Sequence, residues 1–187
     1  VTGKPSGNFS QVSTGDRHTC AIDDNGTVVC WGLDDYDQVT DSPGGTFIQV
    51  SGGGNHTCGI MSDGEAICWG SDLKGQSNAQ PGPFDQISAG GNHTCGVKSD
   101  GEVICWGDNN LNQTESPDVS LLRPQIEAGK YHTCLIQNDG TLDCWGDNSS
   151  GQSSPPGGTF RQVSAGWDHT CGLRSDGTLA CWGNNGD

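Results

Sequence analysis

One motif, Gly-x-x-His-Thr-Cys followed after nine further residues by Cys-Trp-Gly, occurs five times in this chain of 187 residues. The first cysteines of successive copies lie 38, 37, 39 and 37 residues apart. A unit of this size cannot bury a hydrophobic core alone, so neighbouring units must stack against one another. The repeat therefore predicts an array of similar modules, and it constrains the fold more than length does.

Each unit has the pattern of a small antiparallel sheet. An alternating segment such as 9–13 comes first, the His-Thr-Cys strand follows, and a turn containing Asp-Gly or Asn-Gly leads into the Cys-Trp-Gly strand. A polar stretch rich in Pro and Gly, such as 75–83, then has room for a short fourth strand at the edge. The low hydrophobic content of 30% and the 31 glycines agree with short strands and tight turns. We therefore expect an all-β fold, a β-propeller of four-stranded blades.

The two ends of the chain suggest how the blades are arranged. Residues 1–9 align without a gap with residues 39–47, and the chain stops close to the position equivalent to Gln38. We expect the N-terminal segment to complete the last blade, so that both termini close a monomeric ring of five blades. An open solenoid would need capping repeats, whereas part of a larger ring and assembly between chains remain alternatives. This single domain over 1–187 divides into repeats at about 1–38, 39–76, 77–113, 114–152 and 153–187.

The fourth repeat departs from the pattern. Its opening Phe is replaced around Arg123-Pro124, and the linker before it, 108–122, is the longest in the chain. Repeat arrays place such insertions in loops on one face, often a binding face.

The ten cysteines form five equivalent pairs around the five turns. In a hairpin, residues equidistant from the turn face each other with Cβ atoms about 4.5–5.5 Å apart, close enough for a disulfide after a slight adjustment. Zinc is the alternative, but its ligands favour spacings of two to four residues that this chain lacks. We expect one disulfide within each blade: Cys20 with Cys30, Cys58 with Cys68, Cys95 with Cys105, Cys134 with Cys144, and Cys171 with Cys181.

Charge and cysteine content indicate the environment of the protein. Eight Lys and Arg against 23 Asp and Glu give a formal net charge of −15, which repels phosphate backbones and anionic lipids. Nucleic acid and membrane insertion are therefore not expected, and no apolar run approaches the roughly 20 residues of a membrane span. Paired cysteines favour a secreted, cell-surface or periplasmic location. A chain that begins at Val1 also fits a processed segment.

The recurring Val-Ser-Ala-Gly-x-x-His-Thr-Cys, Asp-Gly-Thr-Leu, Cys-Trp-Gly-x-Asn and Gly-Gln segments resemble the regulator of chromosome condensation repeat over essentially the whole chain. The resemblance implies a propeller of four-stranded blades closed by both termini. The family usually has seven blades, whereas this chain has material for five. The paired cysteines resemble those of an extracellular subset that includes bacterial proteins and plant receptor ectodomains. A bacterial propeller that inhibits β-lactamases is similar in architecture and grips its target with loops on one face.

Function does not follow from the fold, because this architecture supports many roles. The acidic, cysteine-paired chain does not fit the nuclear role of the chromatin-bound exchange factor of the family. The five equivalent histidines and five equivalent tryptophans are interpreted as structural, since one repeated contact explains each set. The Asp residues of the turns could bind calcium, but turn geometry already requires them, so no metal or cofactor is assigned. With every His in a repeat position, no catalytic residue is assigned and an enzyme is not expected.

The two positions between Gly and His are the variable part of the motif. Repeats two and three carry Gly-Asn there, whereas the other three repeats carry aromatic or charged side chains, which often anchor interfaces. In a closed ring these three repeats would be consecutive. We therefore predict a non-catalytic module that binds a protein through loops on one face; a multivalent lectin that binds glycans through repeat-equivalent residues is the alternative. The predicted site consists of Asp16, Arg17, Lys130, Tyr131, Trp167 and Asp168.

Overall fold

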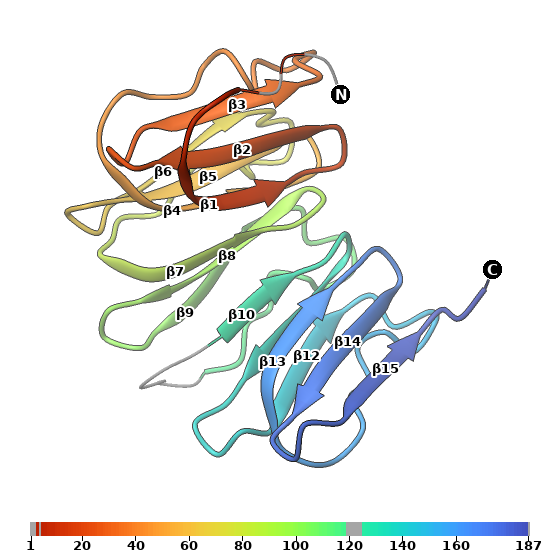
Figure 1. Ribbon diagram of the computed structural model, residues 1–187. Helices are drawn as coiled ribbons and strands as arrows, with labels where there is room; N and C mark the ends of the chain where they lie inside the picture. The colour runs from red at the N-terminus through yellow and green to blue at the C-terminus, as the bar shows by residue number, and fades with distance from the viewer. Residues whose placement is uncertain (1–2, 4, 119–124, 187) are drawn as a thin grey trace.

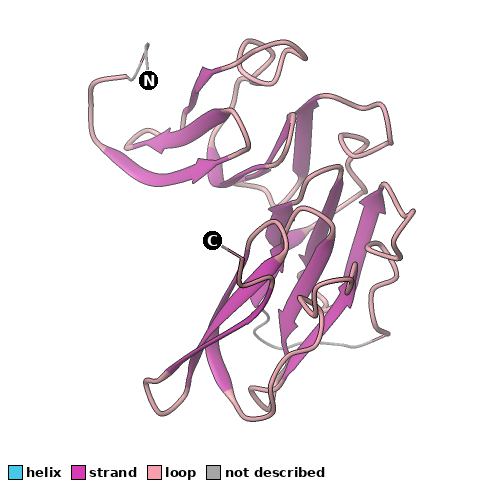
Figure 2. Ribbon diagram, turned by 90° about the vertical axis from the view of Figure 1, so that its right-hand side faces the viewer, coloured by secondary structure: helices cyan, strands magenta, loops and turns pink. Residues whose placement is uncertain are grey.

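The computed structural model describes residues 3, 5–118 and 125–186, which form five three-stranded antiparallel sheets. Strands and loops make up the described part of the chain, as Figure 2 shows, and no helix there is long and apolar enough to cross a membrane. The replacement of Phe around Arg123-Pro124 lies outside the described residues. Each sheet is one blade, with its strands in chain order.

The fifteen strands recur with nearly constant length in every blade. Their bounds are β1 Phe9–Thr14, β2 His18–Asp23, β3 Val28–Gly32, β4 Phe47–Gly52, β5 His56–Met61, β6 Ala66–Gly70, β7 Phe84–Ala89, β8 His93–Lys98, β9 Val103–Gly107, β10 Gln125–Ala128, β11 His132–Ile136, β12 Leu142–Gly146, β13 Phe160–Ala165, β14 His169–Arg174 and β15 Leu179–Gly183.

The predicted hairpin register and the five disulfides are confirmed. Cys20 lies opposite Cys30 and Ile22 opposite Val28, so the Asp-Asn-Gly turn is the centre of the hairpin. The same register holds in the other four blades. Each blade therefore contains one disulfide between its second and third strands: Cys20–Cys30, Cys58–Cys68, Cys95–Cys105, Cys134–Cys144 and Cys171–Cys181.

The blades follow one another in chain order along an arc, from β1–β3 to β13–β15 (Figure 1). The first strands of successive blades lie side by side on the inner side of the arc. The hydrophobic core consists of separate layers between blades. In the first layer, Ile22 and Val28 of one blade pack against Phe47, Val50 and Trp69 of the next. Equivalent clusters occupy the next three junctions, so blade-to-blade packing supplies the core.

Packing inside a blade explains a further part of the repeat. In blades two, three and five, a Cβ at the residue directly after the first cysteine would overlap the ring of the opening Phe; Gly59 beside Phe47 is an example. The fourth blade, whose sequence lacks the opening Phe, has Leu135 at that position, and Leu135 is fully buried. A branched side chain in the middle strand thus fills the volume that the Phe ring takes elsewhere.

A relay of hydrogen bonds crosses each of the four junctions between blades. His56 Nε2 lies 2.9 Å from Thr94 Oγ1 of the next blade, and Thr94 donates in turn to the Gln76 carbonyl at 3.0 Å. Because the Thr hydroxyl proton is used there, the His must donate from Nε2, which leaves Nδ1 unprotonated. The same carbonyl accepts the indole N–H of Trp106 at 3.0 Å. The equivalent His-Thr contacts are His18 with Thr57, His93 with Thr133 and His132 with Thr170.

Two side chains of each first strand tie it to the next one. The Gln11 amide donates to the Val50 carbonyl and accepts from the Val50 N–H, and Ser13 Oγ accepts from Gly52 N at 3.0 Å. Both contacts recur at the following junctions, except that Glu127 replaces the serine in the fourth blade. Burial raises the pKa of Glu127 to about 7.

The predicted fourth strand is not present in the described residues. After Trp69-Gly70 the chain turns back on itself, because Asp72 Oδ1 accepts from Ser77 N at 2.9 Å and Gln76 Oε1 accepts from Lys74 N at 2.8 Å. These side chains take up backbone N–H groups that a strand would use in a ladder. The segment is therefore a capped turn that delivers the Gln carbonyl to the next blade.

Closure of the ring by both termini is not detected in the described residues. At internal junctions the backbone N–H that opens a blade donates to the turn glycine of the preceding blade, as Phe47 does to Gly26 at 2.8 Å. No such bond joins Phe9 to Gly177 in this part of the chain. Residues 5–8 instead line a hollow beside the Asp23–Asn25 turn of their own blade. Among the described residues the N-terminal segment thus lies beside its own blade, and completion of the last blade stays a prediction.

The buried histidines predict a loss of stability in acid. Burial lowers the pKa of His56 and His93 to about 3 and that of His132 to about 4, below the ordinary value of 6.5. As the pH falls, the unfolded chain binds these protons before the folded chain does. The contribution of the neutral histidines to the free energy of unfolding is therefore complete above pH 6.5 and is lost as the pH falls toward the pKa values of the folded state. Denaturant unfolding should show the free energy of unfolding falling by about 1 kcal/mol per pH unit for each such histidine. His93→Gln should reduce this slope, and a variant with the slope of the wild type would contradict the assignment.

Glu127 predicts a dependence of the opposite sign. Its pKa is raised from 4.5 to about 7, so its protonated form stabilises the fold below pH 4.5 and this contribution is lost as the pH rises through 7. Glu127→Gln should therefore make the protein more stable than the wild type at pH 8, by about 2 kcal/mol. Glu115→Gln, at an exposed position, is the control and should change little. Wild-type and Glu127→Gln proteins of equal stability at pH 8 would show that Glu127 ionises without cost.

Candidate functional site at the axial funnel

The first strands of all five blades end together around one hollow, which we call the axial funnel. Its wall consists of small residues, since each first strand leads into the glycine that opens the motif. The hollow has a volume of about 230 Å³. It is lined by Thr14, Gly15, Asp16, Gly52, Gly53, Gly54, Ala89, Gly90, Gly91, Ala128, Gly129, Lys130, Ala165, Gly166 and Trp167.

Backbone hydrogen bonds between neighbouring blades build the funnel wall. The residue after the glycine donates its N–H to the glycine carbonyl of the next blade, as Asp16 does to Gly53 at 3.2 Å and Lys130 to Gly166 at 3.1 Å. A Cβ on Gly53 would lie 2.5 Å from the Gly90 carbonyl oxygen and 2.4 Å from the His56 ring. Glycine is therefore required at this position by the close approach of two backbones.

The side chains at the rim come from the first variable position of the motif. Blades two and three contribute Gly54 and Gly91, so two of the five rim positions have no side chain. Blades one, four and five contribute Asp16, Lys130 and Trp167 to the same hollow. The unusual side chains at this position therefore lie together on one part of the rim.

These side chains contact each other across blades. Lys130 Nζ lies 3.4 Å from the centroid of the Trp167 ring and 5.2 Å from that of Tyr131, distances of a cation–π interaction. Trp167 Nε1 donates to Asp16 Oδ1 at 3.3 Å, which joins the fifth blade to the first. Trp167 remains 57% exposed. The rim therefore presents an ordered indole flanked by one cation and one carboxylate.

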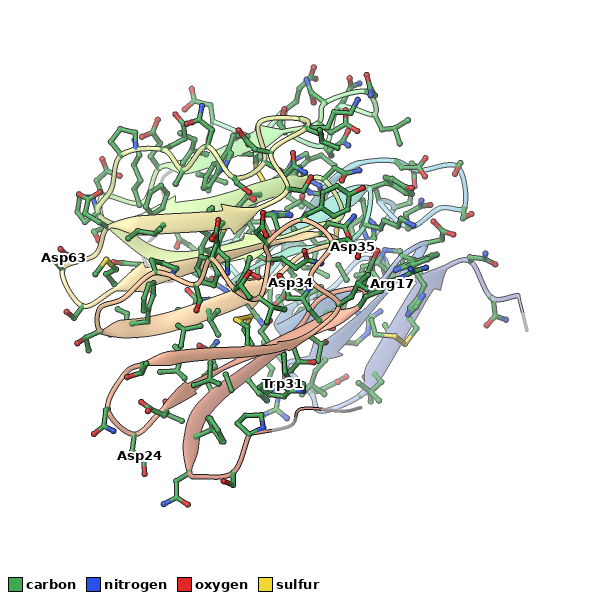
Figure 3. The ribbon with its side chains drawn as sticks, turned by 90° about the horizontal axis from the view of Figure 1, so that it is seen from above. Arg17, Asp24, Trp31, Asp34, Asp35 and Asp63 are labelled. Carbon is green, nitrogen blue, oxygen red and sulfur yellow. A yellow bond between two sulfur atoms is a disulfide. The ribbon has the colours of Figure 1, made fainter. Side chains whose placement is uncertain are left out.

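The second variable position behaves differently. The carbonyls of Arg17 and Asp168 accept backbone N–H groups from Leu33 and Asn184 at 2.9 and 2.7 Å, so their main chain is tied to the end of the third strand of their own blade. Neither residue lines the funnel. Figure 3 shows Arg17 near Asp34 and Asp35, at the end of the blades away from the Asp24 and Asp63 turns. Of the six predicted residues, Asp16, Lys130 and Trp167 line the funnel, Tyr131 contacts Lys130 from the second variable position, and Arg17 and Asp168 do not line the funnel.

The repeated polar residues are committed to the fold. His and Trp side chains hold the junctions, and turn carboxylates such as Asp23 accept backbone N–H groups at 2.8 Å. Among the described residues no group of three or more His, Cys, Asp or Glu side chains has the arrangement of a metal site. Glu127, beside the funnel wall, was not predicted; its one sequence signal is an acidic residue where four repeats have serine.

Solved structures with the same fold include two plant receptor ectodomains. The ectodomain of the Physcomitrella patens receptor kinase CR4 is 28% identical, with a TM-score of 0.80 over 94% of this chain and 51% of its own. The CRINKLY WD40 ectodomain of the Arabidopsis thaliana receptor kinase ACR4 is also 28% identical, with a TM-score of 0.76 over 95% and 66%. The chain thus spans between half and two thirds of these relatives.

Yeast RCC1 (Prp20), solved bound to Kap60, has the same fold at 20% identity, with a TM-score of 0.76 over 95% of this chain and 56% of its own. No curated protein matches the chain. The regulator of chromosome condensation (RCC1) repeat matches at residues 9–38, 47–76, 84–113, 125–152 and 160–187. Because these segments make up most of the sequence and each contains one disulfide-bonded blade, the chain belongs to the RCC1 repeat family.

Proposed function

We propose that this protein is a non-catalytic binding module that engages a protein partner at the rim of the axial funnel. The observation that carries the proposal is the contact of Lys130 with both Trp167 and Tyr131, beside the hydrogen bond from Trp167 to Asp16. These residues come from three blades, so a partner would touch several loops at once. Yeast RCC1 bound to Kap60 is a precedent for protein binding by this fold.

The physical properties of the rim suit an interface anchor. An indole held by a cation on its face and a carboxylate at its N–H loses little conformational freedom on binding, which reduces the entropic cost. Aromatic side chains in ordered positions often dominate binding energy. The surrounding glycine wall has no side chains that would keep a partner away from the Trp167 ring. Asp16 and Lys130 would orient polar groups around the apolar contact.

A glycan partner is the less favoured alternative. A multivalent lectin would use equivalent residues in every blade, and the Trp of the repeat is the natural sugar platform. The indole N–H groups of Trp69, Trp106, Trp145 and Trp182 are instead hydrogen-bonded to Gln carbonyls of the neighbouring blade. The unusual rim residues, by contrast, occur once each.

The proposal predicts that Trp167→Ala weakens binding by about tenfold or more without changing thermal stability. The immobilised protein would be screened against arrayed extracellular proteins and against a glycan array, and each ligand found would be measured by titration calorimetry. Tyr36→Ala is the matched control, because Tyr36 is an exposed aromatic residue that does not line the funnel. Undiminished binding by Trp167→Ala would reject the site, and glycan binding at about one site per blade would favour the lectin.

We further propose a secreted, cell-surface or periplasmic location. Five disulfides, one in each small blade, are typical of proteins that fold in an oxidising compartment. The two receptor ectodomains with this fold agree with such a location. Non-reducing peptide mapping of the native protein should recover five linked peptide pairs. Ten free thiols in the native material would contradict the proposed compartment.

A further inference from the structure

The turns that follow the third strands lie at the funnel end of the blades. Each turn begins beside the second variable position of the motif, whose carbonyl accepts an N–H of the turn, as Asn55 does from Ser71 at 2.8 Å. Asn55 directly follows Gly54, which lines the funnel. In blades two and three these turns expose one leucine each, and we call Leu73 and Leu111 the leucine pair.

Exposed apolar side chains concentrate at this end of the molecule. Leaving aside the outer faces of the first and last blades, five large ones are exposed among the described residues: Tyr36, Ile48, Leu73, Leu111 and Trp167. All but Ile48 lie at the funnel end, since Ile48 follows Phe47, whose N–H donates to the Gly26 carbonyl of a hairpin turn at 2.8 Å. Such a concentration is typical of an interaction surface.

The exposure of the leucine pair does not depend on the ends of the chain. Blades two and three have a neighbour on each side, and apolar layers fill their junctions. Leu73 is nevertheless 78% exposed and Leu111 42%. The N–H of Leu111 donates to Oε1 of the buried Gln113 at 2.8 Å, and Lys74, next to Leu73, makes the same bond in its turn. An apolar side chain on a fixed turn loses little conformational freedom when a partner covers it.

The rim of the funnel has no side chain in the two blades that carry the leucine pair. Gly54 and Gly91 occupy the first variable position there and line the funnel. They directly precede Asn55 and Asn92, whose carbonyls hold the two turns at 2.8 Å. A chain segment that covers Trp167 at the rim therefore has room to continue over the two glycines toward the leucine pair.

The turns of blades one to three, 33–38, 71–76 and 108–113, are acidic. They contain one lysine, Lys74, and five aspartates: Asp34, Asp35, Asp37, Asp72 and Asp108. Lys74 Nζ lies 3.9 Å from Asp108 Oδ1, so the one cation of these turns already has an anion beside it. Figure 3 shows Asp34 and Asp35 at the funnel end, near Arg17. The negative charge of the turns attracts cations and repels anions, which favours a partner of opposite charge.

We propose that the partner docks through an extended cationic segment, in which Lys or Arg side chains are interspersed with apolar ones, over Trp167, the two rim glycines and the leucine pair. This inference rests on the proposed function, because it enlarges the same site and names its occupant. Apolar side chains of the segment pack on the indole and on the leucines, and its cations lie beside the aspartates of the turns. A second copy of this chain does not fit, since its net charge of −15 would repel the same aspartates.

Selection from a peptide library tests the class of the occupant. Short random peptides displayed on phage would be selected on the immobilised wild-type protein at physiological salt, and each enriched peptide would be measured by fluorescence anisotropy. Enriched peptides should combine Lys or Arg with large apolar residues, and their affinity should fall as the salt concentration rises. Neutral or acidic peptides, an affinity that does not change with salt, or the absence of any enriched peptide would overturn the proposal.

Substitution of the leucine pair tests the surface. Leu73→Ser with Leu111→Ser should raise the Kd of an enriched peptide about tenfold, because the double variant lacks two apolar contacts. Ile48→Ser is the matched control, since Ile48 is an exposed aliphatic side chain at the opposite end of the blades, and it should bind like the wild type. Equal affinities of the leucine double variant and this control would overturn the proposal.

Neutralising two aspartates tests the role of charge. Asp35→Asn with Asp72→Asn should raise the Kd of the same peptide about fivefold. The turn itself should be kept, because Asn109 Oδ1 in blade three accepts the backbone N–H equivalent to the one that Asp72 accepts. Asp24→Asn with Asp63→Asn changes the net charge equally at the other end of the blades (Figure 3) and should leave the Kd unchanged. Equal losses in both double variants would contradict a local charge contact.

Trp167→Ala separates this inference from the proposed function. A peptide that loses affinity with Trp167→Ala and not with the leucine double variant would retain the funnel site and overturn its extension to the leucine pair. A peptide that loses affinity with the leucine double variant and not with Trp167→Ala would support the leucine pair as a docking surface and reject Trp167 as the anchor of the proposed function.

Discussion

The structure depends on a histidine that must stay neutral. At each internal junction the His Nε2–H donates to a Thr of the next blade, and where the Thr hydroxyl is placed it donates on to a Gln carbonyl, as in His56, Thr94 and Gln76. These atoms are buried, so an unpaired donor or a positive charge would be costly there. The Nδ1 atom of these histidines has no hydrogen-bond partner in the described residues. This agrees with a tautomer in which Nδ1 carries no proton, because a second N–H would lack an acceptor there.

The same junctions explain how a chain of low hydrophobic content remains folded. Each blade supplies a thin apolar layer of a few side chains, such as Ile22 and Val28, and receives a similar layer from the next blade. A disulfide closes each hairpin beside that layer, and the polar relay runs next to it. Apart from the Trp167–Asp16 hydrogen bond, the packing and hydrogen bonds described above join successive blades, which is the behaviour of a repeat array.

The funnel follows from the close approach of backbones at the inner ends of the blades. Since Gly53 and its equivalents exclude any Cβ, the funnel wall carries no side chain at this position of the motif. The position that follows is free to vary, and its side chain points to the rim. Departures from the repeat at this position therefore concentrate in one place, where Asp16, Lys130 and Trp167 meet. A structural constraint on one residue has thus defined where a site can form.

The sequence by itself determined the strands, the hairpin register, the five disulfides and the number of blades, because these depend on local pattern and on a period repeated five times. It also identified the two variable positions, of which the first lines the funnel with Asp16, Lys130 and Trp167 and the second, with Arg17, Tyr131 and Asp168, does not. Tertiary structure alone decided that separation, since two adjacent residues point in different directions. It also replaced the expected fourth strand by a turn, because the side chains of Asp72 and Gln76 bind the backbone N–H groups of their own segment. Closure of the ring was likewise beyond the sequence, because two segments that align with one repeat need not meet in space.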